Sequence, residues 1–169
     1  MTARTILSFP DDRLSLAAQP VEAFDASLAR LADDLVDTLR AEGPAIGLSA
    51  PQIDDQRQVL IMDMTGTGES PEVFVNPRIV SQAGFGLAEE RCLSVPEAVI
   101  YGWRAAQIRV EAFDLEGAKF ERELNDMAAV CLQHEMDHFH GKILVDRMSF
   151  VGRFLYRRKA RRLAASAPA

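Results

Sequence analysis

QHEMDH, residues 133–138, is the stretch that decides the fold of this 169-residue chain. Its two histidines, His134 and His138, stand four residues apart, so on a helix they lie on one face, one turn above the other. Both imidazoles can then reach a single cation. Glu135 follows the first histidine, so its carboxylate can approach a water on that cation without being a ligand. The pattern predicts a helix that carries a hydrolytic metal site; the alternative is a solvated face of a charged helix.

The predicted helix has signals at both ends. Asn125 or Asp126 is a suitable N-terminal cap, and the helix is expected to run to about His140. Gly141 fits the position that follows the C-cap. We therefore interpret this segment as the central helix of the fold.

A hydrolytic metal site needs three protein ligands and an open position for water, so two histidines leave one ligand to find. Asp146 could serve in principle, whereas His140 points roughly to the opposite helix face and is expected on the surface. Upstream, Cys92 lies in residues 84–97, which are interpreted as a loop with a strand inside. Cys131 shares a helix face with the first histidine. As a fourth ligand it would stop hydrolysis, so we expect it to form an apolar wall of a pocket.

The flanking segments predict an α+β fold, with antiparallel strands around the central H-E-x-x-H helix and a helix near each end of the chain. Asp25 is a plausible cap for the first helix, whose apolar residues recur every three or four positions until Gly43 and Pro44 end it. Strands are expected at 58–64, 73–77 (stopped by Pro77), 104–114 and 118–124, with 78–82 as a candidate continuation, and loops at 10–20, 43–52 and 65–71.

Composition favours a globular protein. Apolar residues make up 48% and charged residues 26%, and the length suits a single domain over 1–169. No apolar run is long enough to span a bilayer, and the first residues lack the features of a signal peptide. We therefore expect a cytoplasmic protein without membrane contact. We also expect a monomer. The two cysteines are expected to be free thiols or metal ligands.

Three segments resemble motifs of the peptide deformylase family. EERCLS (89–94) is similar to E-G-C-L-S, QHEMDH (133–138) to Q-H-E-x-D-H, and AIGLSAPQ (45–52) to G-x-G-x-[AS]-A-x-Q. They occur in the family's order and spacing. The resemblance implies a metal-dependent hydrolase that removes the N-formyl group from the N-terminal methionine of newly made peptides, and therefore formylated nascent peptides as partners.

The resemblance also implies a role for each matching position. One divalent ion would be bound by Cys92, His134 and His138. The resemblance implies Fe(II) as the natural ion, with zinc, nickel or cobalt as replacements. Glu135 would act as general base and then general acid, while Gln52 and the backbone N–H of Leu93 would hold the oxygen of the tetrahedral intermediate. The residues expected to bind substrate are Ile46, Gly47, Ala88, Arg91, Met127, Val130 and Cys131.

Two family glycines are replaced, by Ala45 and Arg91. Arg91 either points to solvent with negative φ, or narrows the cleft beside the metal and pairs with an acidic group of an unusual substrate. Ala88 is smaller than the branched residue usual there. These departures leave two alternatives open: a divergent amidase acting on another formylated or acylated amine, and a weakly active relative that docks on the ribosome.

The end of the chain is basic. The net charge is −6, yet residues 150–169 carry six basic residues and no acid, which leaves −12 for residues 1–149. A helix is expected at about 149–163. It is either a solvated helix end or an anchor to ribosomal RNA, since an arginine-rich helix neutralises phosphates.

Overall fold

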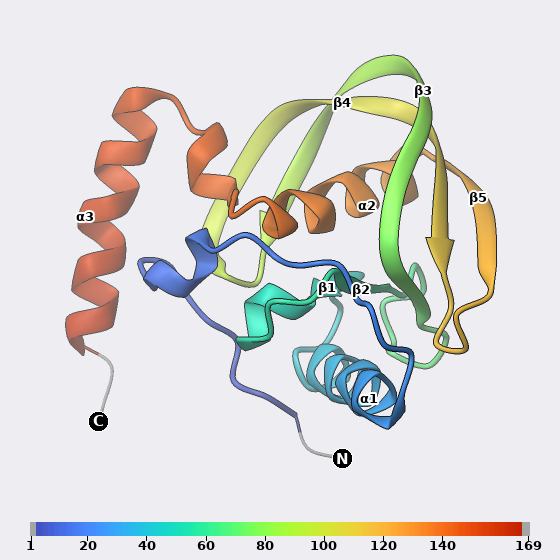
Figure 1. Ribbon diagram of the computed structural model, residues 1–169. Helices are drawn as coiled ribbons and strands as arrows, with labels where there is room; N and C mark the ends of the chain where they lie inside the picture. Colours follow the sequence, from blue (N-terminus) through green and yellow to red (C-terminus); the bar gives the residue numbers. More distant parts are fainter. Residues whose placement is uncertain (1–2, 167–169) are drawn as a thin grey trace.

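The computed structural model describes the backbone of residues 3–166 and the side chains of residues 3–162; the ends of the expected domain, 1–2 and 167–169, lie outside. Within these residues the chain forms one five-stranded antiparallel sheet and three α-helices. The strands, in sheet order, are β1 (Gly47–Ser49), β2 (Val59–Met62), β3 (Glu72–Cys92), β4 (Val95–Phe113) and β5 (Lys119–Asn125). The helices are α1 (Ala26–Ala41), α2 (Asp126–Phe139) and α3 (Phe150–Ser166), with short 3-10 turns η1 (Asp12–Ser15), η2 (Ala50–Ile53) and η3 (Leu144–Arg147). Figure 1 shows β3 and β4 arching over α2. The predicted α+β class is confirmed.

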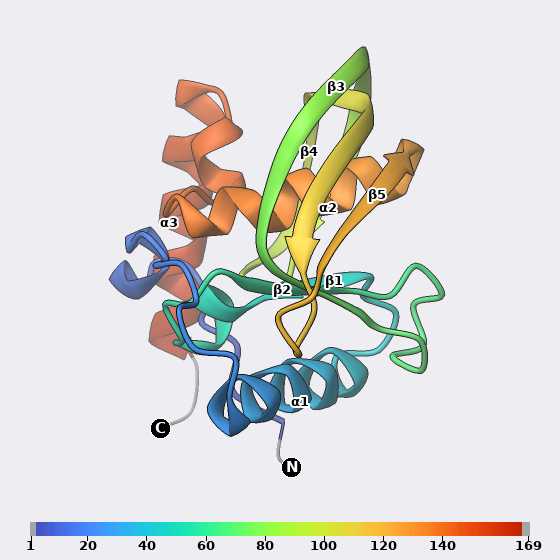
Figure 2. The same ribbon diagram turned by 45° about the vertical axis from the view of Figure 1, so that its right-hand side comes forward.

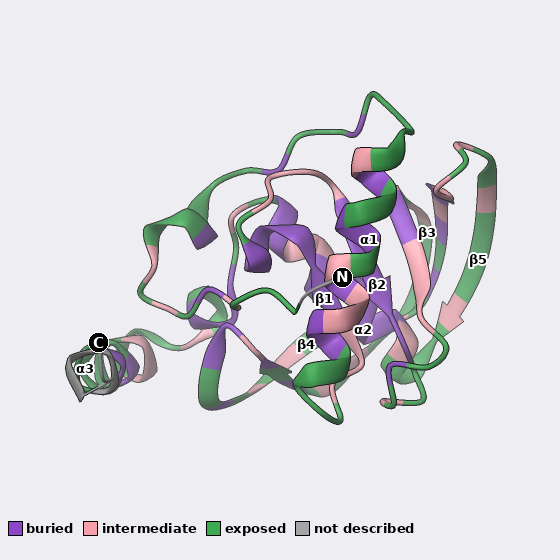
Figure 3. Cartoon of the chain, turned by 90° about the horizontal axis from the view of Figure 1, so that it is seen from below, coloured by how far each residue is buried: buried purple, intermediate pink, exposed green. Residues whose placement is uncertain are grey.

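β2 lies between two apolar cores. Leu60 and Met62 belong to the core that includes α2, whereas Val59 and Ile61 belong to the core formed with α1. Successive side chains of a strand point to opposite faces, so a strand covered on both faces is apolar without interruption. Figure 2 shows the two helices on opposite sides of β1 and β2, and Figure 3 shows buried residues concentrated on these elements while β5 is largely exposed.

The first helix begins and ends as the sequence predicts. The Asp25 carboxylate accepts hydrogen bonds from the backbone N–H groups of Ser27 (2.8 Å) and Leu28 (3.3 Å), which satisfies two of the free donors at the helix start. The leucines that recur along α1 are buried. The helix therefore supplies one wall of the core beneath β2.

The central helix also has the predicted bounds. Asn125 occupies the N-cap position, although its side chain makes no capping hydrogen bond, and His140 is the C-cap. Gly141 follows with φ +64°, the left-handed conformation that glycine adopts without steric cost. α2 therefore holds its histidines on a helix that is defined at both ends.

Two predictions about the strands are wrong. Pro77 does not stop a strand, because β3 runs without interruption to Cys92. Residues 84–97 contain the expected strand but are not otherwise a loop, since only Leu93 and Ser94 lie between β3 and β4, which starts at Val95. The pairing of β3 with β4 shifts register between Val75 and Arg78. Such bulges accommodate a proline, which cannot donate to the ladder, and they bend the strand.

The predicted loops at 10–20 and 43–52 also contain ordered structure. η1 lies in the first loop, and β1 followed by η2 lies in the second. β1 pairs antiparallel with β2, from Gly47 opposite Met62 to Ser49 opposite Leu60. A three-residue strand is too short to show a periodic pattern, so sequence periodicity does not predict it.

α3 packs on the β3–β4 turn through one side. Tyr156 and Ala160 are buried in a third apolar cluster, and the Tyr156 hydroxyl donates to the Pro96 carbonyl at 2.9 Å. Lys159 forms an ion pair with Glu97 at 2.7 Å. Across the described part of the chain, no helix combines the length and the apolar character that crossing a membrane requires.

The turn after α2 yields a stability prediction. A Cβ at position 141 would collide with the Ser15 carbonyl, in addition to being held at positive φ. Gly43 also has positive φ, +86°, but nothing lies within 4 Å of its missing Cβ. We expect Gly43→Ala to cost about 1 kcal/mol of unfolding free energy and Gly141→Ala about 2–4 kcal/mol. Urea denaturation measures both, and equal losses would contradict the close approach at Ser15.

Candidate metal centre

Three side chains from β3 and α2 converge on one point. Cys92 ends β3, and its Sγ lies 3.4 Å from Nε2 of His138. His134 lies one helical turn earlier, with the two imidazole centroids 5.3 Å apart. One ligand atom from each residue lies within 4.8 Å of the others. The three residues therefore form a candidate metal-binding group, brought together from segments 42 or more positions apart.

The chemistry of this group fits a divalent ion. Nε2 of His134 is buried and has no hydrogen-bond partner among the described residues, so its lone pair is available. One sulfur and two nitrogen donors leave a fourth position open, the arrangement of hydrolytic sites. Asp146 instead accepts a hydrogen bond from the Ile143 backbone N–H at 3.1 Å, and His140 is exposed.

Glu135 lies beside the group without joining it. Its side chain is buried, and Oε2 has no hydrogen-bond partner within residues 3–162. Burial raises the pKa of this carboxyl. A Cβ on Gly47 would lie 2.7 Å from Sγ of Cys131 and 2.9 Å from Oε1 of Glu135. Only glycine therefore allows β1 to approach α2 this closely.

Gln52 points into the same site from η2. Its Oε1 accepts hydrogen bonds from the Ser49 backbone N–H (3.0 Å) and hydroxyl (2.9 Å), which fixes the orientation of the amide. Its Nε2 donates to Ser94 Oγ at 3.1 Å and lies 3.7 Å from Cys92 Sγ. The amide N–H₂ is thus directed at the cysteine. Leu93, which follows that cysteine in the β3–β4 turn, is half-buried.

A buried carboxylate that the sequence did not single out lies behind His134. Oε2 of Glu90 is 2.9 Å from Nδ1 of this histidine, and Arg104 donates to both carboxylate oxygens of Glu90, at 2.9 and 2.7 Å. Burial opposes ionisation of Glu90, but hydrogen bonds from His134 and Arg104 outweigh it and lower the pKa to about 2. The signal in the sequence is that Glu90 stands two positions before Cys92, on the same face of a strand.

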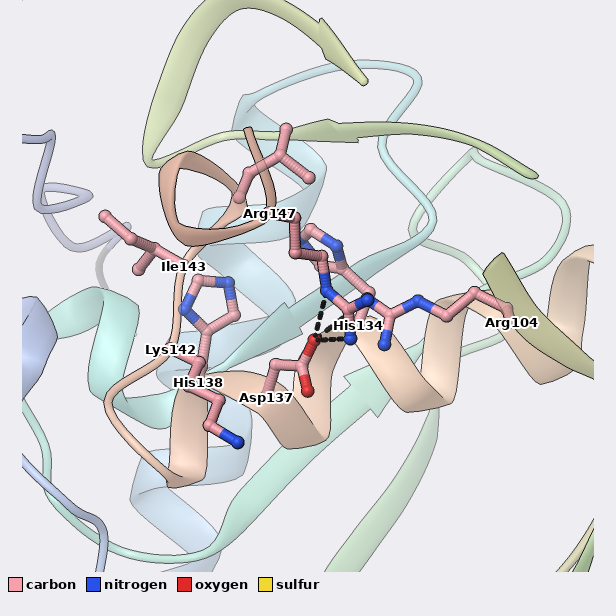
Figure 4. Close-up of a pocket in the computed structure, with 8 residues that line it drawn as sticks. Arg104, His134, Asp137, His138, Lys142, Ile143 and Arg147 are labelled. Carbon is pink, nitrogen blue, oxygen red and sulfur yellow. Dashed lines mark hydrogen bonds and ion pairs between the residues drawn. The ribbon is translucent and has the colours of Figure 1, made fainter. Parts of the chain in front are cut away.

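The network continues to the surface through Asp137. Figure 4 shows this carboxylate between the guanidinium groups of Arg104 and Arg147, with Oδ2 2.9 Å and 2.8 Å from them. Arg147 comes from η3, beyond the end of α2. Alternating charges therefore connect the surface to the nitrogen of His134 that faces away from the candidate metal position.

The residues expected to bind substrate occupy three elements. Val130 and Cys131 are buried on α2, whereas Met127 in its first turn is 48% exposed. The Cys131 thiol donates to the carbonyl of Ile46 at 3.6 Å. Ala88 is half-buried in β3, opposite Gly102. Ile46 and Gly47 are half-buried as well, so of these expected residues Met127 and Arg91 are the exposed ones.

Arg91 points to solvent. Its side chain is 71% exposed, and its guanidinium donates to Oε1 of Glu89 at 3.0 Å. It is absent from the residues with positive φ, as is Ala45. The backbone at positions 45 and 91 is thus not left-handed and does not require glycine. The Arg91 side chain also does not crowd the candidate metal ligands.

The fold and this site define a class: a hydrolase of the H-E-x-x-H type whose third metal donor is a cysteine on a strand. Residues 3–153 match the family model described as polypeptide deformylase. The chain belongs to the peptide deformylase family, which confirms the resemblance of the three motifs.

Individual relatives agree over nearly the whole chain. A peptide deformylase of Nitrosococcus oceani is 43% identical over 160 residues, 95% of each chain, and one of Chromobacterium violaceum is 42% identical over 149 residues, 88% of this chain and 89% of the relative. The crystal structure of a peptide deformylase from Legionella pneumophila superposes with a TM-score of 0.91 at 42% identity, covering 99% of this chain and 100% of the other.

The carboxylate behind His134 leads to a prediction. We expect Glu90→Gln to weaken metal binding about 10- to 100-fold, because the partner that orients the imidazole loses its charge. Glu89→Gln is the matched control: the neighbouring carboxylate lies on the outer face and bonds to Tyr101 and Arg91, so metal affinity should be unchanged. Competition with a chromophoric chelator measures both, and equal affinities of the two variants would refute the assigned role of Glu90.

Proposed function

We propose that this protein hydrolyses the N-formyl group from the N-terminal methionine of newly made peptides, at a divalent ion held by Cys92, His134 and His138. The observation that carries the proposal is the convergence of these ligand atoms within 4.8 Å beside the buried Glu135. The comparisons support this activity rather than either alternative raised by the sequence. Turnover of formyl-Met peptides by protein loaded with iron in the absence of oxygen tests it.

The ion proposed is Fe(II), with zinc, nickel or cobalt as replacements, since a thiolate and two imidazoles suit all of them. A thiolate and a divalent cation leave the centre with a net charge of about +1. The ion supplies Lewis acidity, which makes water acidic enough to lose a proton near pH ~7. Metal analysis of protein purified without oxygen identifies the natural ion.

Glu135 is proposed to move the proton. It accepts a proton from the attacking water and returns it to the nitrogen of the departing amine, so one carboxylate is general base and then general acid. Because burial raises its pKa, the Glu135 carboxylate accepts a proton more readily than an exposed carboxylate, and the protonated form can then donate it. Glu135 Oε2 has no hydrogen-bond partner among the side chains that the structure describes, which leaves it available for this exchange.

Gln52 and the backbone N–H of Leu93 are proposed to stabilise the oxygen that becomes negative in the tetrahedral intermediate. Removing one such donor typically costs about 10²–10³ in rate. Both amide protons of Gln52 have partners in the free protein, but the 3.7 Å contact with the Cys92 sulfur is the weaker of the two. That proton is the one to redirect to the substrate.

The formylated methionine side chain is proposed to enter a pocket formed by the residue before β1 and by residues of β1, β3 and α2: Ile46, Gly47, Ala88, Met127, Val130 and Cys131. Support comes from Gly47, which approaches both Cys131 and Glu135, from the contact of Cys131 with the Ile46 carbonyl, and from the apolar character of the set. Burial raises the pKa of the Cys131 thiol well above its usual value, so this residue acts as an apolar wall rather than as a thiolate ligand.

Two substitutions separate metal binding from proton transfer. We expect Glu135→Gln to retain about one equivalent of metal while losing about 10³-fold or more in kcat, since the variant has no group to take the proton. Cys92→Ala should lose the metal itself, because it removes a ligand and its charge. Metal content after dialysis and turnover of formyl-Met-Ala-Ser measure the two effects. Near-parental turnover by Glu135→Gln would remove this residue from the mechanism.

α3 is proposed to anchor the protein on the ribosome, where formylated chains emerge. Arg157, Arg158, Arg161 and Arg162 are exposed, while Tyr156 and Ala160 face the body. Deleting residues from 153 onward would therefore also remove buried contacts. Neutralising the four arginines leaves those contacts in place and tests the charge alone.

We expect the variant with all four of these arginines changed to Gln to co-sediment with ribosomes less than the parent at low salt, with kcat/KM for a formyl tripeptide within a few-fold. The matched control neutralises four exposed arginines elsewhere: Arg30, Arg78, Arg109 and Arg122. Equal sedimentation of parent and α3 variant would identify α3 as a solvated helix.

The cytoplasm is the proposed location, and a monomer the proposed state. Both cysteines are free thiols, which suits a reducing compartment. Analytical ultracentrifugation of the metal-loaded protein measures the oligomeric state directly.

A further inference from the structure

Four large apolar side chains are exposed together on the outer face of the β3–β4 hairpin. Phe85 and Leu87 on β3 are 65% and 60% exposed, and Tyr101 and Trp103 on β4 are 62% and 68% exposed. Leu87 and Trp103 are direct cross-strand partners, and Tyr101 is paired with Glu89. We name these four residues the hairpin patch. Apolar side chains gathered on paired strands form a contiguous patch, and the largest such patch of a protein is often functional.

The hairpin patch lies on the side of β3 opposite to the metal ligand. Glu90 and Cys92 point inward, and a Cβ on Gly102 would lie 3.1 Å from Glu90 Oε1, so this glycine is on the inner face as well. Side chains alternate along a strand, which places Leu87 on the outer face. One strand therefore has the candidate metal site on one face and the hairpin patch on the other.

The edge of that strand is open. From Arg78 to Cys92, β3 pairs with β4, and no other strand of the described residues 3–166 pairs with it there. A polypeptide that leaves the inner face can cross this edge and reach the outer one. Leu87 stands five positions before Cys92, roughly 17 Å along the strand, which an extended peptide covers in about five residues.

Size and charge limit what can cover the hairpin patch. Taking about 150–250 Å² for each aromatic side chain, the four residues expose on the order of 500 Å², less than the ~800 Å² that each partner contributes to a stable dimer. The charged residues at its inner end, Glu89 and Arg91, neutralise each other in an ion pair. A neutral surface of this size suits an extended apolar peptide better than a second copy, an anionic membrane or RNA.

We propose that the hairpin patch binds an apolar stretch of the substrate polypeptide itself, about four to eight residues after the formylated methionine. The inference rests on the proposed deformylase activity and adds a selectivity to it: peptides with apolar residues at these positions are held more tightly than polar ones. Continuity with the candidate site supports it, since Arg91, which lies between the hairpin patch and the candidate metal site along β3, directly precedes Cys92.

Steady-state kinetics with the metal-loaded protein test the proposal on three formyl peptides. One is formyl-Met-Ala-Ser. The other two have nine residues and begin with the same three. At positions five to nine, one carries Leu, Phe and Val and the other carries Ser, Thr and Gly. We expect the apolar nonapeptide to have a KM about tenfold below that of the polar one. In the double variant Leu87→Ser, Trp103→Ser the difference should vanish, while tripeptide turnover shows that the variant is folded.

The matched control is Phe154→Ser, Leu155→Ser, two side chains on α3 that are 55% and 57% exposed. It should keep the tenfold preference. Equal KM values for the two nonapeptides with the parent overturn the proposal, provided that the tripeptide is turned over; failure on the tripeptide would instead remove the deformylase activity. The proposal is also overturned if the parent protein sediments as a dimer and the Leu87→Ser, Trp103→Ser variant sediments as a monomer. The hairpin patch would then be an interface between two copies of the chain.

Discussion

The buried contact between Glu90 and Arg104 is the constraint on which the rest of the site depends. An isolated carboxylate at this depth would be costly, and here an arginine and a histidine compensate for its desolvation. The contact joins the hairpin to α2, because Glu90 lies on β3, Arg104 on β4 and His134 on the helix. Cys92 follows Glu90 by two positions on the same face, so the ion pair also sets how far its thiol lies from His138.

The opposite wall of the site is held by close backbone approach rather than by charge. Gly47 lets β1 lie against Cys131 and Glu135, at distances that no other residue allows without displacement. Gln52 then follows from η2 with its amide oxygen anchored on Ser49. β1 and η2, which together span only seven residues, thus pack against Glu135 and supply Gln52, the two side chains proposed to move the proton and to bind the developing negative charge.

The sequence predicted the parts of this arrangement that depend on local chemistry. The cap at Asp25 and the helical spacing of His134 and His138 are written within a few consecutive residues, and both were located correctly. The long strands were not, because β3 contains Pro77, Gly84 and Gly86 and several exposed polar residues, which in isolation resemble a loop. The partners of Glu90 could not be predicted from spacing either: Arg104 and His134 lie 14 and 44 positions away, and only the fold brings them together.

Alternation along β3 explains why the chain accepts an arginine where its family has glycine. The register of β3 against β4 shifts between Glu90 and Cys92, so position 91 lies at a bulge between two inward-facing residues. Its φ is not positive, and its side chain lies on the outer face, where the guanidinium donates to Glu89, a carboxylate that also accepts a hydrogen bond from the Tyr101 hydroxyl. The replacement therefore alters the surface that continues into Leu87 and Trp103 and leaves the ligand side of the strand unchanged. Neighbouring residues of one strand point to opposite faces, so one is constrained by the buried site and the next only by the surface. Whether a departure from the family pattern affects the site therefore depends on the face of the strand to which the side chain points.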